Sequence, residues 1–232
     1  MAVYITGDTH GDIDREKLSK KQFPKQRWMK SKDVVIIAGD FGAIWNGTSQ
    51  DTYNIKWYNE KKFTTAFVDG NHENHWLLNS YPVRQWHGGK VHRISDKVVH
   101  LMRGEIYNIE GKTFFVMGGA SSVDKAFRQL GVSWWPEELP DIKEYNNAMK
   151  NLIKHNFKVD YVITHTCPTK ILDSLYSGIH PQVIRDEVSD FLNKLEDKDH
   201  LQYTHWYFGH HHVDKLIDKK HTAVYNEVIR II

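Results

Sequence analysis

Five apolar runs of strand length, each followed directly by a short polar stretch, constrain the fold of this chain more than any other feature. The runs cover residues 3–5, 34–38, 66–68, 161–163 and 206–208. Strands that are apolar on both faces must be covered on both faces, which is typical of parallel sheets in α/β proteins. Loops that leave the carboxyl ends of such strands share one edge of the sheet. We therefore expect an α/β fold whose polar stretches gather in one crevice.

The first half of the chain predicts how these strands are connected. Residues 15–30 are basic and poorly periodic and lie between the first two strands, in what reads as a β-α-β opening, and residues 50–63 favour a helix. A further helix is expected to start at residues 74–78. Residues 91–117 contain three short apolar segments separated by Gly104 and Gly111, a pattern that indicates hairpins in an antiparallel or mixed second sheet.

The second half predicts a long loop, two helices and a return to strands. Residues 120–140 lack periodicity and should form the loop. Asp141, with Glu144 three residues later, has the pattern of a capping box at a helix start. A second helix should begin near Pro181 and bury one apolar face. This face would contain Ile184, Val188, Phe191, Leu192 and Leu195, and strands are then expected at residues 206–208, 213–217 and 222–229.

These elements favour two sheets packed face to face with helices outside. Such layers bury the apolar strands on both sides. A chain of 232 residues is long enough for one well-buried core, so we expect residues 1–232 to form a single domain.

The five polar stretches carry the side chains that bind transition metals. Asp8 and His10 are two residues apart, as are His210 and His212, so each pair can point to the same side of an extended backbone. If Asp40 bridges two ions, each ion receives four ligands. The first set is Asp8, His10, Asp40 and His212, and the second is Asp40, Asn71, His165 and His210.

The donor types indicate both the metals and the reaction. Mixed imidazole and oxygen ligands suit manganese, iron, zinc or a similar ion, and argue against calcium or a magnesium-only site. Two divalent ions outweigh the charge of two aspartates and a bridging hydroxide, which favours an anionic substrate. A metal pair can activate water as a nucleophile and stabilise the oxygens of an in-line phosphoryl displacement. We therefore expect phosphate-ester hydrolysis without a covalent intermediate.

Three residues next to the ligands are expected to have other roles. His72 follows Asn71 and is predicted to be catalytic, either protonating the leaving oxygen or stabilising the phosphate. Glu73 is expected either to support a ligand or to be an early helix acid. The side chain of His211 should face away from the metals.

The long loop offers candidate substrate contacts. Arg128 is a candidate to pair with phosphate, and Trp134 and Trp135 are candidates to form an aromatic wall. The alternative for the two tryptophans is that they pin the loop to the body of the protein.

The order of these motifs resembles the calcineurin-like metallophosphoesterase superfamily. The match runs through Asp8-Thr9-His10, Gly39-Asp40, Gly70-Asn71-His72-Glu73, His165 and Gly209-His210-His211-His212, nearly the whole chain. The resemblance implies a four-layer α/β/β/α sandwich, a two-metal site and hydrolysis of phosphomonoesters or phosphodiesters. It also supports the ligand sets given above.

One motif departs from that pattern. Protein serine/threonine phosphatases of the superfamily continue the second motif with another aspartate and an arginine, whereas Phe41-Gly42-Ala43-Ile44-Trp45 follows Asp40 here. The resemblance therefore argues against a protein phosphatase. It also leaves the residue that orients His72 unidentified.

Charge and composition bound the alternatives. Lysine plus arginine (31) nearly balances aspartate plus glutamate (29), giving a net charge of +2, and no run of like charge suggests a nucleic-acid arm. A nuclease is therefore less favoured than an enzyme for small phosphorylated substrates. A non-catalytic metal-binding scaffold would not need His72. The single Cys167 and the lack of a signal peptide or a span of about 18 apolar residues predict a cytoplasmic protein that does not contact membranes. The sequence leaves the oligomeric state open.

Overall fold

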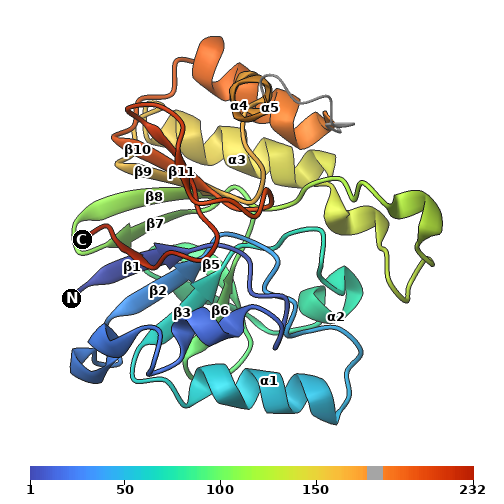
Figure 1. The fold of residues 1–232 in the computed structure, drawn as a ribbon. Coiled ribbons are helices and arrows are strands. Elements are labelled where there is room, and N and C mark those ends of the chain that lie inside the picture. The colour runs from blue at the N-terminus through green and yellow to red at the C-terminus, as the bar shows by residue number, and fades with distance from the viewer. Residues whose placement is uncertain (177–184) are drawn as a thin grey trace.

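A computed structural model describes residues 1–176 and 185–232 and shows two β-sheets stacked face to face (Figure 1). Helices cover the outer face of each sheet, so the layers run helix, sheet, sheet, helix. The two ends of the chain lie side by side, because the backbone N–H of Ile231 donates to the carbonyl of Val3. The predicted four-layer α/β/β/α fold is confirmed.

The first sheet has seven strands in the order β13-β1-β2-β3-β6-β5-β4. Its centre is parallel, from β1 through β2 and β3 to β6, and antiparallel strands complete both edges. The strands are β1 (Val3–Thr6), β2 (Val34–Ile37), β3 (Thr64–Phe67), β4 (Val83–Trp86), β5 (Gly89–Arg93), β6 (Val98–Leu101) and β13 (Ile229–Arg230).

The second sheet has six strands in the order β11-β12-β10-β9-β8-β7. Strands β8, β9, β10 and β12 are parallel, and β7 and β11 are antiparallel edges. The strands are β7 (Ile106–Ile109), β8 (Lys112–Met117), β9 (Tyr161–Thr164), β10 (His205–Phe208), β11 (Lys215–Leu216) and β12 (His221–Ala223).

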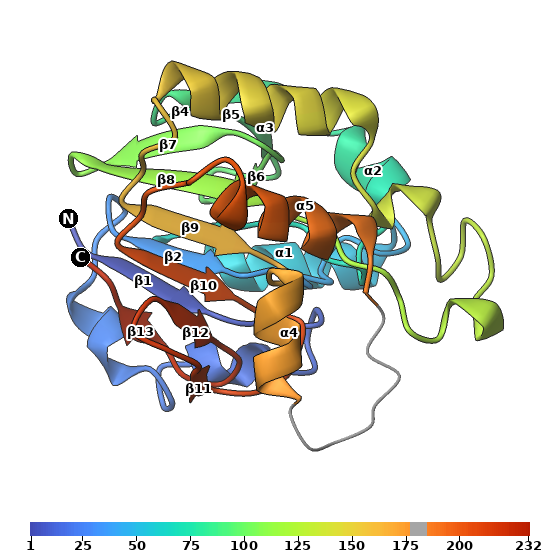
Figure 2. The same ribbon diagram turned by 90° about the horizontal axis from the view of Figure 1, so that it is seen from above.

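Five α-helices and four 3-10 helices are described. The helices α1 (Ser49–Asn59) and α2 (His75–Asn79) lie on the side of the first sheet, whereas α3 (Ile142–Lys154), α4 (Thr169–Leu175) and α5 (Glu187–Asp197) cover the second (Figure 2). The 3-10 helices are η1 (Arg15–Leu18), η2 (Pro24–Trp28), η3 (Lys125–Phe127) and η4 (Pro136–Glu138). The capping box of Asp141 and Glu144 is present at the start of α3. Within residues 1–176 and 185–232, no helix has both the length and the apolar character to span a bilayer.

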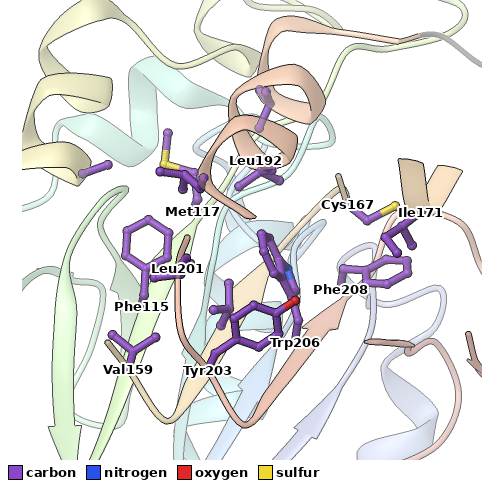
Figure 3. Packing of buried hydrophobic residues seen from close by; sticks show 14 of the residues in the cluster. Phe115, Met117, Val159, Cys167, Ile171, Leu192, Leu201, Tyr203, Trp206 and Phe208 are labelled. Atoms are coloured by element: carbon purple, nitrogen blue, oxygen red, sulfur yellow. The ribbon is translucent and has the colours of Figure 1, made fainter. Parts of the chain in front are cut away.

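Side chains of successive strand residues enter different cores, which explains the continuous apolar runs. In β8, Phe114 and Val116 pack between the sheets, whereas Phe115 and Met117 pack under the helices of the second sheet. Side chains alternate between the two faces of a strand, so a sheet covered on both sides needs apolar residues at every position. Figure 3 shows Phe115 and Met117 in the outer core together with Trp206 of β10 and Leu192 of α5.

The structure corrects two predictions in the first half of the chain. The β-α-β opening is wrong, because the connection from β1 to β2 contains η1 and η2 in place of an α-helix. Pro24 stands at the first position of η2, where its missing N–H costs least. The segment at residue 98 does not belong to the second sheet, since β6 pairs in parallel with β3 of the first. The hairpin of β4 and β5 was not predicted.

Three further differences lie in the second half. The predicted strand at residues 222–229 is split into β12 and β13, because Asp214 accepts hydrogen bonds from the backbone N–H groups of Tyr225, Asn226 and Glu227 and holds them in a loop. Helix α4 was not predicted. Helix α5 begins at Glu187 with Asp186 as its cap, and the predicted start near Pro181, with Ile184, lies outside the described residues. The single-domain organisation of residues 1–232 stays a prediction.

Candidate metal centre

The loops that follow β1, β2, β3, β9 and β10 bring their polar side chains together around Asp40. Oδ2 of Asp40 lies 3.4 Å from Nε2 of His10, and Oδ1 lies 3.2 Å from Nε2 of His165. The two oxygens of one buried carboxylate therefore face imidazoles from two different sheets. This is the geometry that a bridging ligand requires.

All seven predicted ligands meet in two groups that share Asp40. Asp8, His10, Asp40 and His212 each offer one ligand atom, and these atoms all lie within 4.8 Å of one another. Asp40, His165 and His210 meet the same criterion. Oδ1 of Asn71 lies 3.0 Å from Nε2 of His165, which places it beside the second group. The two groups are the ligand sets that the sequence predicts.

Hydrogen bonds from outside the groups fix how two of these imidazoles point. Nδ1 of His10 lies 2.6 Å from Oδ2 of Asp14, and Nδ1 of His165 donates to the carbonyl of Ala38 at 3.1 Å. In both rings Nε2 is left to face Asp40. Metal-binding histidines commonly have such a partner on the second nitrogen.

The amide of Asn71 is oriented in the same manner. Its Nδ2 donates to Oγ of Ser122 at 3.3 Å, which leaves Oδ1 on the side of His165. Ser122 is in turn held by Glu138, which accepts a hydrogen bond of 2.6 Å from its hydroxyl. Neither Ser122 nor Asp14 was found from the sequence, because nothing in their local pattern distinguishes them from ordinary loop residues.

The backbone of four proposed ligands adopts a left-handed conformation. The φ angles are 43° at His10, 44° at Asp40, 67° at His210 and 50° at His212. Residues other than glycine rarely have positive φ, and such residues cluster at functional sites, where the surrounding structure holds them. The fold therefore maintains a costly backbone to aim these four side chains inward.

Two glycines leave room for the ligands. A Cβ on Gly39 would lie 1.8 Å from Nδ1 of His165, and one on Gly70 would lie 2.0 Å from Oδ1 of Asp40. Both positions thus exclude any side chain. The sequence alone indicates only that glycine permits tight turns there, whereas the structure shows which ligand each glycine accommodates.

The electrostatics of the centre favour bound cations. Burial opposes ionisation of Asp40, but the charge of His165 and hydrogen bonds from His10 and His165 hold the pKa of its carboxyl well below the usual value. Burial likewise disfavours a charged His165, and the opposing charge of Asp40 raises the pKa of this imidazole to about 10. Buried carboxylates that draw protons onto nearby imidazoles will also stabilise metal ions in their place. The donor set, the glycine clearances and the charges fit two divalent transition-metal ions.

Glu73 supports the loop that carries Asp40. Its side chain is fully buried, and Oε1 accepts hydrogen bonds from the backbone N–H groups of Phe41 at 2.7 Å and Gly42 at 3.3 Å. Helix α2 begins only at His75, so Glu73 is not a helix acid. Of the two roles expected from the sequence, the structure favours support of a ligand.

His72 lies at the edge of the centre and contacts Arg128. The backbone N–H of His72 donates to Oδ1 of Asp40 at 2.8 Å, and Nη2 of Arg128 lies 3.1 Å from Nε2 of the imidazole. A guanidinium can only donate, so Nε2 accepts and a neutral ring carries its hydrogen on Nδ1. Burial first, and then the charge of Arg128, lower the pKa of His72 against the opposing effect of Asp40. Arg128 is itself held by Asp124, whose Oδ1 lies 2.6 Å from its Nε.

The two tryptophans of the long loop were expected either to form a substrate wall or to pin the loop to the body of the protein. Trp135 is only 1% exposed, which favours the alternative that it pins the loop to the body of the protein. It packs edge-on against Trp45, with ring centroids 5.1 Å apart. Trp134 lies under Nζ of Lys125 at 4.2 Å, and its predicted part in the wall is not tested by this contact. Figure 1 shows residues 120–140, drawn in yellow-green, projecting beside α2.

Trp45 and His211 complete the surroundings of the centre. The Trp45 indole is half-buried and lies nearly parallel to His72, at 6.4 Å between centroids and 24° between planes. It was missed because an aromatic residue in a loop carries no periodic signal, and only its position five residues after Asp40 hinted at it. His211 points away from the two groups, and its Nδ1 lies 2.9 Å from the Tyr176 hydroxyl.

Comparisons with known proteins give one family match over most of the chain. The model of the calcineurin-like phosphoesterase family matches residues 1–214. No curated protein matches the chain. Among solved structures, the fold is similar to that of the Thermus thermophilus sulfate thiohydrolase SoxB in complex with glycerol, with a TM-score of 0.44 and 11% identity over 99% of this chain and 53% of that one. This chain thus spans about half the length of that protein.

Proposed function

The chain belongs to the calcineurin-like phosphoesterase family, and on that premise we propose that it hydrolyses a small phosphomonoester or phosphodiester with two bound divalent ions. The observation that carries the proposal is the position of Asp40, whose two oxygens face the two ligand groups. A single carboxylate shared in this way favours a dinuclear site over two separate ones. Manganese, iron and zinc suit the mixed imidazole and oxygen donors.

The seven side chains would divide between the two ions as the ligand groups do. When bound, such an ion pair supplies an activated water and stabilises the charge on the phosphoryl oxygens. The first ion would be held by Asp8, His10, Asp40 and His212, and the second by Asp40, Asn71, His165 and His210.

His72 and Arg128 would act on the substrate itself. Arg128 presents a planar guanidinium that can bind phosphate oxygens through two parallel hydrogen bonds. A phosphate that takes this guanidinium would release Nε2 of His72 from its present contact. The freed imidazole could then hold a proton near the leaving oxygen, an effect worth roughly 10²- to 10⁴-fold in general acid catalysis.

Two alternatives to this function are less favoured. A nuclease is less favoured because the net charge is only +2, and a non-catalytic scaffold because it needs no His72.

We also propose a cytoplasmic location, which rests on the single cysteine, Cys167, a buried free thiol.

The deciding experiment measures metal uptake and turnover together. We expect protein stripped with a chelator to be inactive, to bind two Mn²⁺ or Zn²⁺ ions per chain in calorimetry, and then to hydrolyse p-nitrophenyl phosphate or its bis-p-nitrophenyl diester. Metal uptake without hydrolysis of either ester would indicate a scaffold, and faster cleavage of a DNA oligonucleotide would indicate a nuclease.

Two variants separate the proposed roles. Asp40→Asn should weaken the binding of both ions, because the shared ligand loses its charge. His72→Ala should bind two ions and lose roughly 10²- to 10⁴-fold in kcat. Full activity of His72→Ala would refute its catalytic role.

A further inference from the structure

A pocket of about 330 Å³ opens directly beside the proposed metal centre. It lies between the loop after β1, the loop after β2 and the first turns of α1, and His10 and His72 form one of its walls. Building on the proposed function, we propose that this pocket receives the leaving group of the phosphate ester, and that this group is a nucleoside with a planar, uncharged base.

The position of the pocket supports a leaving-group site. His10 is a proposed metal ligand and His72 contacts Arg128, so a phosphate held between them has one side open to the pocket. Its volume lies at the lower end of the range for sites that bind small molecules, roughly 300 to 1,000 Å³. The space therefore suits one nucleoside and not a polymer.

An aromatic side chain held in place forms part of the wall. Trp45 lines the pocket, and Trp135 packs edge-on against it from the buried side. The backbone N–H of Trp45 donates to Oδ2 of Asp51 at 2.8 Å. Ile13, on the facing loop, is 76% exposed. An indole fixed by packing can stack on a ring at little entropic cost.

Amide groups of the wall can read the edge of a base. Asn54 is 4% exposed and lines the pocket, and its Oδ1 accepts from Arg15 at 2.7 Å. In the described part of the chain, no acceptor is bonded to its Nδ2, which is thus free to donate to a ligand. Gln50 is tied by Nε2 to Asp12 at 3.0 Å, and its Oε1 can accept. Paired donors and acceptors of this kind match the edges of purines.

The charge of the wall excludes a second phosphate. Among the described residues that line the pocket, Asp12 and Asp51 are the acidic side chains, and no lysine or arginine is present. Arg15 lies behind the wall and is held by Asn54. A polyphosphate or an acidic peptide would face two carboxylates without a counter-charge. An uncharged nucleoside meets no such repulsion.

The first test measures binding without metal or turnover. Adenosine is titrated into the protein in the presence of a chelator, and its affinity is followed by ligand-observed NMR. We expect binding that Trp45→Ala weakens roughly 5- to 160-fold, the range for loss of one base stack. Trp45→Phe keeps a ring and should retain most of the affinity. Trp28→Ala removes a tryptophan that is 78% exposed on η2 and serves as the matched control, with unchanged affinity.

The second test compares two esters in the metal-loaded protein. Adenosine 5′-monophosphate should have a higher kcat/KM than glycerol phosphate, and Trp45→Ala should lower the ratio of the two values. Adenosine binding that depends on Trp45, with neither ester hydrolysed, would support the pocket and overturn the proposed function. Hydrolysis of both esters at a ratio that Trp45→Ala leaves unchanged, with no adenosine binding, would overturn the pocket alone.

Discussion

The buried pair of Arg103 and Asp69 gives the sharpest stability prediction. Both side chains are nearly inaccessible, at 4% and 2% exposure. Nε of Arg103 donates to Oδ2 of Asp69 at 2.8 Å, Nη2 bonds the same oxygen, and Nη1 pairs with Glu144 at 3.0 Å. In Arg103→Met, His100 remains the only side chain that bonds Asp69 among those described. One buried charge is then left largely uncompensated.

The expected loss follows from that uncompensated charge. Removing one partner of a buried ion pair costs about 3 to 5 kcal/mol of unfolding free energy. For a chain of this size each kcal/mol shifts Tm by roughly 2 to 4 °C, so Tm should fall by roughly 6 to 20 °C. Urea and thermal unfolding are measured in a chelator, since bound metal would add its own stabilisation.

Two further variants decide whether charge is the cause. Arg84→Met removes an exposed arginine of β4 and should change the unfolding free energy by no more than about 0.5 kcal/mol. The double variant Asp69→Asn with Arg103→Met has no unpaired buried charge, since the side chain of Glu144 is 39% exposed, and should regain at least half of the loss. A loss below about 1 kcal/mol in Arg103→Met, or no recovery in the double variant, would refute this reasoning.

Three other predictions follow from single contacts. Gly70→Ala should lower the metal affinity measured by calorimetry, because the added Cβ would lie 2.0 Å from Oδ1 of Asp40. Gly111→Ala is the control, since no atom lies within 4 Å of its added Cβ, and equal metal affinities of the two variants would contradict the clearance argument. Arg128→Met should lower kcat/KM for p-nitrophenyl phosphate about 13- to 160-fold, the value of one charged hydrogen bond. An unchanged value would remove Arg128 from the site. Burial opposes the charge on Glu196, but hydrogen bonds from His221 and Tyr203 lower its pKa to about 2, and the pKa of His221 is raised against burial by Glu196. The difference in unfolding free energy between wild type and Glu196→Gln should therefore be largest near pH 5.5, which lies between the unfolded pKa values of glutamate (about 4.3) and histidine (about 6.5). It should shrink as the pH falls toward 2, where Glu196 is protonated, and as the pH rises past the folded pKa of His221, where the imidazole is neutral. A difference that does not vary with pH would refute the pairing.

The parts of the fold that the sequence predicted well are those governed by local pattern. The strands that carry the ligands were located because burial on both faces requires continuous apolar runs. The start of α3 was found because a capping box is complete within four residues. The connection at residues 15–30 was mispredicted, since its short 3-10 turns have no distinctive period.

In the candidate site, too, local patterns located some residues, whereas contacts between distant segments were not predicted. The side chains that were expected to gather lie in two groups around Asp40, because parallel strands deliver their ends to one edge of a sheet. The contact between Arg128 and His72 joins residues 56 positions apart, and it depends on the path of a loop without periodicity. Ser122 lies 51 positions from the Asn71 that it orients.

The sequence by itself determined which residues stand at strand ends and what chemistry they carry, since both follow from short apolar runs and the residues next to them. Only the tertiary structure decided that Arg128 holds His72, that Trp135 is buried behind Trp45, and that β6 joins the first sheet. These contacts link segments far apart in the chain, and their energies are set by packing between loops and layers, which no local pattern encodes.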